Sequence, residues 1–116
     1  MELREWAIQI LSADTLQGKL ADPGVWTDYT PGPALIWKEP IRPSGMHFCR
    51  RSKEEKLPSF QEHHDPYKRA LCLHRFAGHE LLAVEIMAFA LLAFPDAPST
   101  FRRGLAHTLR EEQGHV

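Results

Sequence analysis

The stretch that most constrains this chain runs from Pro66 to Phe94, where no proline interrupts a helix. It begins at Asp65-Pro66, an acidic N-cap followed by proline at the first helical position, and Pro95 ends it. At a rise of 1.5 Å per residue the predicted helix is about 43 Å long, which is typical of bundle proteins. After the FPDAPS turn we expect a second helix from about Ser99 to the end of the chain. The short connection makes the two helices antiparallel neighbours, so we predict a mainly α fold.

The rest of the chain divides into two further segments of the same domain. We expect short N-terminal helices over residues 1–22, a Pro-rich arm over 23–65, and the helical hairpin over 66–116. In the first segment Asp14 is a candidate N-cap for a second short helical turn. The apolar residues that fall at helical spacing there are Leu3, Trp6, Ala7, Ile10 and Leu11.

Seven of the nine prolines lie from Pro23 to Pro66, six of them within the arm, which excludes long helices there. It is nevertheless too apolar for a disordered linker, so we expect it to pack on the helical body. Its apolar residues include Trp26, Tyr29, Leu35, Ile36, Trp37, Met46 and Phe48.

The composition argues against several classes of protein and partner. A net charge of -1 gives no electrostatic reason to expect nucleic acid or an anionic membrane as a partner. Cys49 and Cys72 are too few for a disulfide framework, and the opening residues lack the pattern of a leader peptide. The longest apolar run, LLAVEIMAFALLAF, is interrupted by Glu85 and is shorter than the roughly 20 residues that span a bilayer. We therefore expect a cytoplasmic protein with reduced thiols and no membrane partner.

Steps of three and four residues along the long helix give an apolar face that contains one carboxylate, that of Glu80. This face consists of Leu73, Phe76, Glu80, Ala83, Met87, Ala90 and Phe94. The corresponding face of the second helix consists of Phe101, Leu105, Thr108, Glu112 and His115. We interpret both faces as inward-facing. Burial of a lone carboxylate costs several kcal/mol, so a Glu on such a face needs a cation or a metal as its partner.

Glu112 and His115 are three residues apart, so an oxygen and an imidazole nitrogen can reach one ion. In an antiparallel hairpin Glu80 lies at the same height, since Glu80 and Glu112 are each about 20 Å from the turn. A Glu-x-x-His pair also occurs by chance on solvated helices, so a structural role stays open. We predict Glu80, Glu112 and His115 as metal ligands and assign no catalytic residue.

Other titratable residues have simpler interpretations. Glu85 lies about 140° around the helix from Glu80. This angle favours a role in helix pairing, or in contact with a metal-ligating residue, over direct binding of the metal. His79 could likewise contact a metal-ligating residue or act as a ligand, or it could form an interhelical hydrogen bond. Two Cys/His pairs, His47 with Cys49 and Cys72 with His74, are spaced more tightly than most zinc ligands, so zinc is disfavoured.

The remaining histidines and the basic clusters are interpreted as surface groups. His63 and His64 precede the helix cap, and His107 lies off the inward-facing side. The basic residues lack the interleaved aromatics of a nucleic-acid platform, so we assign them to solvated faces. They are Arg50, Arg51, Lys53, Arg102 and Arg103.

The stretch LHRFAGHELLAVEIMAFALLAFPDAPSTFRRGLAHTLREEQGH resembles the first helical hairpin of the ferritin-like di-iron carboxylate superfamily. Within it, the chain resembles a bacterial family of ferritin-like domains of unknown function, family 455, over essentially its whole length. The HEL-x-A-x-E pattern and the terminal Glu-x-x-His carry this resemblance. By position, Glu80 matches the first-helix ligand, Glu112 and His115 match the second-helix pair, and Glu85 matches a further acidic position.

The resemblance implies a four-helix bundle in which four glutamates and two histidines hold two metal ions, with iron expected and manganese as the alternative. It also implies an oxidoreductase or oxygen-activating enzyme such as a hydroxylase. The substrate is not indicated, because the fold hosts storage, oxidation and hydroxylation. The family's other two helices do not follow Val116, so we expect either a truncated half-bundle or a protomer that pairs with a copy of itself.

An alternative is a non-catalytic helical interaction module or an inactive fragment of such a protein. It rests on an apolar surface that two short helices and an arm cannot cover alone, which predicts self-association or another partner. The residues of that surface are Leu81, Leu82, Ile86, Phe89 and Leu92.

Overall fold

The computed structural model describes residues 1–47 and 64–116, and these residues are mainly α-helical. The helices are α1 (Leu3–Ser12), α2 (Leu16–Lys19), α3 (Pro66–Ala93) and α4 (Ser99–Gln113). In the described ranges the only β pairing is an isolated bridge between Glu2 and Thr27. The predicted mainly α fold is confirmed.

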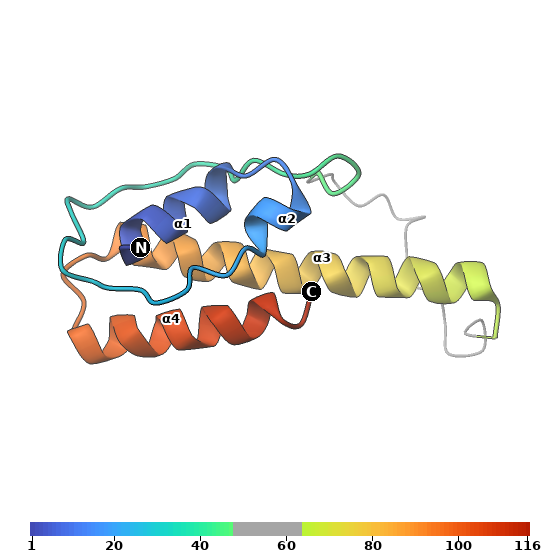
Figure 1. The fold of residues 1–116 in the computed structure, drawn as a ribbon. Helices are drawn as coiled ribbons and strands as arrows, with labels where there is room; N and C mark the ends of the chain where they lie inside the picture. Colours follow the sequence, from blue (N-terminus) through green and yellow to red (C-terminus); the bar gives the residue numbers. More distant parts are fainter. Residues whose placement is uncertain (48–63) are drawn as a thin grey trace.

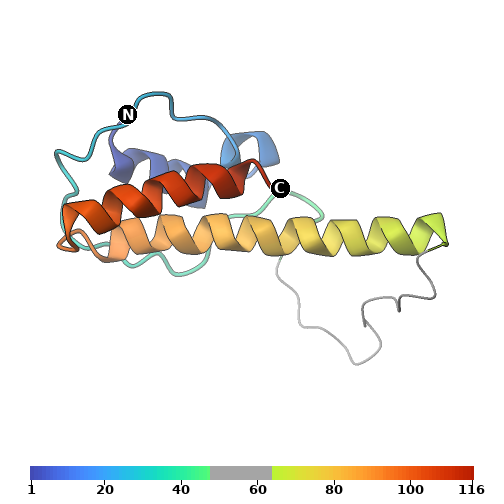
Figure 2. The same ribbon diagram turned by 90° about the horizontal axis from the view of Figure 1, so that it is seen from below.

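Helices α3 and α4 form the predicted antiparallel hairpin, and they lie side by side in both ribbon views (Figures 1 and 2). The Asp65 side chain accepts a hydrogen bond from the Tyr67 amide at 2.9 Å, so it caps α3 with Pro66 at the first turn. Pro95 follows the C-cap residue, Phe94, and prevents continuation of the helix. The sequence therefore predicted both ends of α3 to within a residue.

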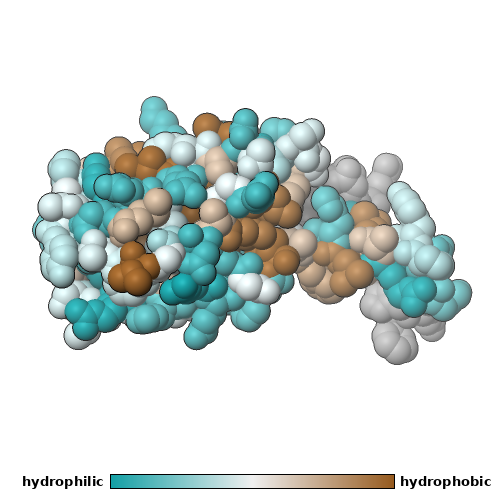
Figure 3. All heavy atoms as spheres, viewed as in Figure 1, coloured by the Kyte–Doolittle hydropathy of each residue, from teal (hydrophilic) through white to brown (hydrophobic). Residues whose placement is uncertain are grey.

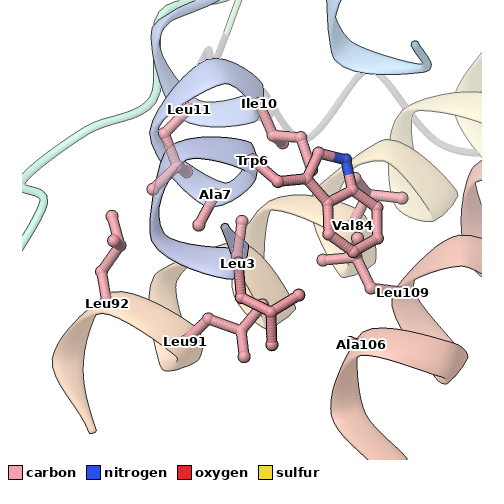
Figure 4. Packing of buried hydrophobic residues seen from close by; sticks show 11 residues of the cluster. Leu3, Trp6, Ala7, Ile10, Leu11, Val84, Leu91, Leu92, Ala106 and Leu109 are labelled. Atoms are coloured by element: carbon pink, nitrogen blue, oxygen red, sulfur yellow. The ribbon is translucent and has the colours of Figure 1, made fainter. Parts of the chain in front are cut away.

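Helix α1 covers one side of the hairpin and creates the core (Figure 4). The apolar face of α1 is almost fully buried against side chains from α3 and α4. Each fully buried large side chain contributes about 1.5–3 kcal/mol to folding. The buried cluster consists of Leu3, Trp6, Ala7, Ile10, Leu11, Val84, Ala88, Leu91, Leu92, Ala106 and Leu109.

Helix α2 begins one residue later than predicted. Its N-cap is Thr15, whose hydroxyl accepts a hydrogen bond from the Gly18 amide at 3.0 Å, and not Asp14. The physical reason is that the cap oxygen must reach an amide in the first turn, and Thr15 is the residue from which it does so. Helix α2 ends at Lys19, whose side chain is fully buried.

The arm packs on the helical body, as predicted for its described part up to residue 47. The Leu35 amide donates to the Leu92 carbonyl at 2.9 Å, and the Ile41 amide donates to the Leu11 carbonyl at 2.8 Å. Trp26, Leu35 and Trp37 are partly buried against the core cluster. Tyr29 and Ile36 are exposed, contrary to expectation, and Phe48 lies outside the described residues.

The predicted inward-facing sides of α3 and α4 are the less buried sides in this chain. Leu73, Phe76, Phe94 and Phe101 are each more than half exposed. The prediction was wrong because α1 packs on a different face of α3, where Val84, Ala88 and Leu91 are buried. The same face also buries Leu81 and Leu92, two of the five residues predicted to need a partner.

Apolar side chains remain on the surface along α3. Figure 3 shows them near the middle of the molecule and along the part of α3 that extends past α4. The exposed apolar residues of α3 include Leu73, Phe76, Leu82 and Ile86.

By length and composition α3 is also long and apolar enough to cross a membrane, since it contains an 18-residue window with a mean hydropathy of 1.7. The core helix of a soluble protein meets the same criteria, and 39% of this window is buried in the structure. The absence of a membrane partner stays a prediction.

Candidate metal centre

Glu80 lies near the middle of α3 and close to Glu112 of α4. The C-terminal end of α4 comes alongside the middle of α3 in both ribbon views (Figures 1 and 2). Its side chain is 41% exposed, so the carboxylate lies at the surface of the α3–α4 seam and not in the core. The uninterrupted helix from Asp65 to Pro95 fixes its height relative to the turn.

Glu112 and His115 come from the C-terminal end of α4, as their spacing predicts. The His115 Nδ1 atom lies 3.5 Å from Glu112 Oε2 and 3.9 Å from Glu80 Oε2. One potential ligand atom from each of the three residues lies within 4.8 Å of the other two. The predicted match in height between the two helices is therefore present in the structure.

The two carboxylates shift each other's pKa in opposite directions. The hydrogen bond to Glu112, followed by desolvation and the Glu112 charge, raises the pKa of Glu80 above its usual value. The same hydrogen bond lowers the pKa of Glu112. The two directions are consistent, because of the two carboxyl groups Glu80 is the one that binds a proton more readily and Glu112 the one that stays ionised to lower pH. Two carboxylates that lie this close together can share a divalent cation.

The donor set fits a first-row divalent metal. Two carboxylate oxygens and one imidazole nitrogen are ligands that suit iron and manganese, and zinc also accepts them. Three protein ligands on one side leave coordination positions open. Among the described residues this is the one group of three or more His, Cys, Asp or Glu side chains that could converge on an ion.

The structure separates Glu85 from these three residues. Glu85 is 2% exposed, and its Oε2 atom lies 3.0 Å from both Lys19 Nζ and Arg42 Nε. Arg42 Nη2 also contacts the other carboxylate oxygen. Glu85 thus joins α3 to α2 and to the arm, which matches the helix-pairing role among those predicted for it.

His79 precedes Glu80, and its charge would favour the ionised form of that carboxylate. The described members of the two Cys/His pairs and His107 do not belong to the group of three converging ligands. His74 is exposed and Cys72 is buried, while Cys49 lies outside the described residues. His107 contacts Trp26 edge to face, with ring centroids 5.3 Å apart.

Sequence reasoning missed three residues that position α4. Arg102, predicted as solvated, is buried: it pairs with Asp28 at 2.7 Å and donates to the carbonyls of Leu91 and Phe94 at the end of α3. Gln113 and Lys19 are buried too, and the Gln113 Nε2 atom donates to the Lys19 carbonyl at 3.0 Å. Only the position of Gln113 on the face of Ala106 and Leu109 could have indicated this burial.

A sequence model of the family described as "Protein of unknown function (DUF455)" matches residues 6–116. The chain belongs to this family. The DUF455 match includes α2, α3, α4 and most of α1, so it contains Glu80, Glu112 and His115 together with Glu85. No curated protein and no solved structure matches the chain.

Proposed function

We propose that this DUF455 chain supplies one half of a ferritin-like di-metal carboxylate centre, with iron as the expected metal and manganese as the alternative. The observation that carries the proposal is the convergence of Glu80, Glu112 and His115 within 4.8 Å from two helices. The mutual pKa shifts of the two carboxylates support it, because they reflect how close the two groups lie, and a cation between them could bind an oxygen of each.

A centre of two ions needs about six protein ligands, and one hairpin offers three. The proposal therefore includes a second hairpin that faces the first, from a second copy of the chain or from two further helices. Exposed apolar residues on the Glu80 face of α3 support such a contact, since Phe76 lies about one turn and Leu73 about two turns before Glu80.

When bound, iron or manganese would supply redox chemistry with positions open to dioxygen, so the proposed activity is that of an oxidoreductase or hydroxylase. The roles of the chain's own residues are narrower. Glu80 and Glu112 would supply oxygens, and His115 would supply a nitrogen. Metal binding needs both carboxylates in their ionised form, so affinity should increase as pH rises through the raised pKa of Glu80.

The decisive experiment is an anaerobic Fe(II) titration on protein of known assembly mass. We expect one iron per chain in a dimer, and loss of this uptake in Glu112→Ala. Glu111→Ala is the matched control, because Glu111 is exposed in the same turn of α4 and is absent from the ligand group. Equal uptake by Glu112→Ala and the unmodified protein would contradict the proposal.

A second candidate function is a non-catalytic helical interaction module, and the exposed apolar side chains of α3 favour it. This candidate predicts association without metal. Sedimentation of the metal-free protein tests it: a well-folded monomer at micromolar concentration would contradict it, whereas a metal-free dimer without iron uptake would favour it over the metal centre.

A further inference from the structure

Two of the three candidate ligands lie at the C-terminal end of α4, Glu112 in its last turn and His115 just beyond it, and helix ends ordinarily fray. Helix α4 ends at Gln113, one residue after Glu112 and two before His115. After it, the His115 amide still donates to the Glu112 carbonyl at 3.0 Å. A ligand pair at such an end needs an anchor if it is to keep a fixed distance from Glu80.

Gln113 provides a buried hydrogen bond at this point. Its side chain is 8% exposed, and Nε2 donates to the main-chain carbonyl of Lys19 at 3.0 Å. The last carbonyls of a helix have no partner within the helix, and at the end of α2 the Lys19 carbonyl accepts its hydrogen bond from the Gln113 side chain instead. The bond joins residues 94 positions apart in the sequence.

Lys19 is itself fixed at both ends. Its amide donates to the Thr15 carbonyl at 3.1 Å within α2. Its ammonium group is fully buried, donates to the Ile10 carbonyl of α1 at 2.7 Å, and lies 3.0 Å from the Glu85 carboxylate of α3. Lys19 therefore connects the helix of Glu80 to the turn of Glu112 and His115: through its side chain to Glu85 and through its carbonyl to Gln113.

We propose that Gln113 is a positioning residue for the metal centre: its hydrogen bond to Lys19 holds Glu112 and His115 opposite Glu80. This inference rests on the proposed function. It differs from a general role in holding α4 in place, which Arg102 and the exposed Arg110–Asp22 pair fulfil elsewhere along the helix. Gln113 is the anchor between the two ligands.

The test compares Gln113→Met with the unmodified full chain. Methionine keeps the length and approximate volume of the side chain but has no N–H donor. Without metal, amide hydrogen exchange should become faster at residues 112–116 and stay unchanged in the middle of α3. In an anaerobic Co(II) titration, affinity should fall about tenfold, and the visible spectrum at saturating Co(II) should change because the ligands are less well placed.

The spectrum separates positioning from general stability, because a role in folding alone would lower the melting temperature and leave the saturated spectrum unchanged. Glu111→Gln, at an exposed position of the same turn, should match the unmodified protein in both measurements. If Gln113→Met folds poorly, Gln113→Glu also removes the donor with little change of shape.

The outcomes distinguish this inference from the proposal on which it rests. If the unmodified protein binds no Co(II) or Fe(II), the metal centre itself is wrong and the inference falls with it. If the unmodified protein binds metal and the Gln113 variants bind it with the same affinity and spectrum, only the positioning role is overturned. Weaker binding with an altered spectrum in the Gln113 variants alone supports the role.

Discussion

Replacing Glu85 by alanine should destabilise the fold more than any exposed substitution, because it leaves two buried cations without their shared anion. The Glu85 carboxylate is 2% exposed and lies 3.0 Å from Lys19 Nζ and from Arg42 Nε. Removing one partner from a buried ion pair costs about 3–5 kcal/mol. Domains have about 5–15 kcal/mol of stability in total, so Glu85→Ala should use a large part of it.

For a chain of this size each kcal/mol shifts the melting temperature by about 4 °C, so the expected decrease is roughly 12–20 °C. Circular dichroism during thermal and urea unfolding measures it. The control Glu111→Ala should stay within about 0.5 kcal/mol of the unmodified protein, because Glu111 is exposed. A loss below about 1 kcal/mol in Glu85→Ala would refute the reasoning.

The pH dependence of the unfolding free energy gives a second test of the buried Glu85, Lys19 and Arg42 cluster. Burial lowers the pKa of Lys19, and the hydrogen bond and charge of Glu85 oppose that shift. Without Glu85 the folded-state pKa of Lys19 should decrease further below its unfolded value. The unfolded chain then binds more protons, so the stability of Glu85→Ala should increase as pH rises towards the unfolded pKa. The triple variant with Glu85→Leu, Lys19→Met and Arg42→Met should regain at least half of the unfolding free energy that Glu85→Ala loses, because no buried charge is left in the cluster.

Two further predictions concern carboxylates outside that cluster. Hydrogen bonds from Thr27 and Thr30 lower the pKa of Glu2 to about 2, so its contribution to stability is complete above pH 4.5 and is lost as pH falls towards 2. Glu2→Gln should flatten this part of the pH profile in urea unfolding; a profile like that of the unmodified protein would contradict the assignment. The hydrogen bond with Glu112 raises the pKa of Glu80, so the metal-free protein should lose the contribution of that bond to stability as pH rises through the raised pKa. Glu80→Gln keeps a donor for Glu112 without titrating, so its metal-free form should be at least as stable at pH 7–8 while Fe(II) binding is lost; unchanged Fe(II) binding would count against Glu80 as a ligand.

The hairpin could be predicted because its signals are local. The Asp65-Pro66 start, the stop at Pro95 and the short turn to Ser99 act through a few neighbouring residues, and each lies where the sequence predicts. The convergence of Glu80 with Glu112 and His115 then follows from helix geometry alone, because residues at equal distances from an antiparallel turn lie at equal heights.

The packing of the N-terminal segment could not be predicted in the same way. Both sides of α3 are apolar, so periodicity does not indicate which side α1 covers, and the sequence analysis assigned the inward side wrongly. Lys19, Arg42 and Arg102 are residues that are usually solvated, and their burial depends on partners far away in the chain. The sequence does not indicate these ion pairs, because only the tertiary fold places Glu85 next to Lys19 and Arg42, and Asp28 next to Arg102.

The exposed side of the hairpin links metal binding to association, if both proposals hold. Covering Leu73 and Phe76 with a second hairpin would also bury the adjacent Glu80 and Glu112 carboxylates. Burial of an unpaired carboxylate costs several kcal/mol, and this cost opposes the free energy gained by burying apolar surface in the contact. A divalent cation between the carboxylates removes that cost, so metal should strengthen association. By thermodynamic reciprocity, association should strengthen metal binding by the same factor. The apolar surface and the ligand group therefore favour a partner that brings ligands of its own over one that offers only an apolar face.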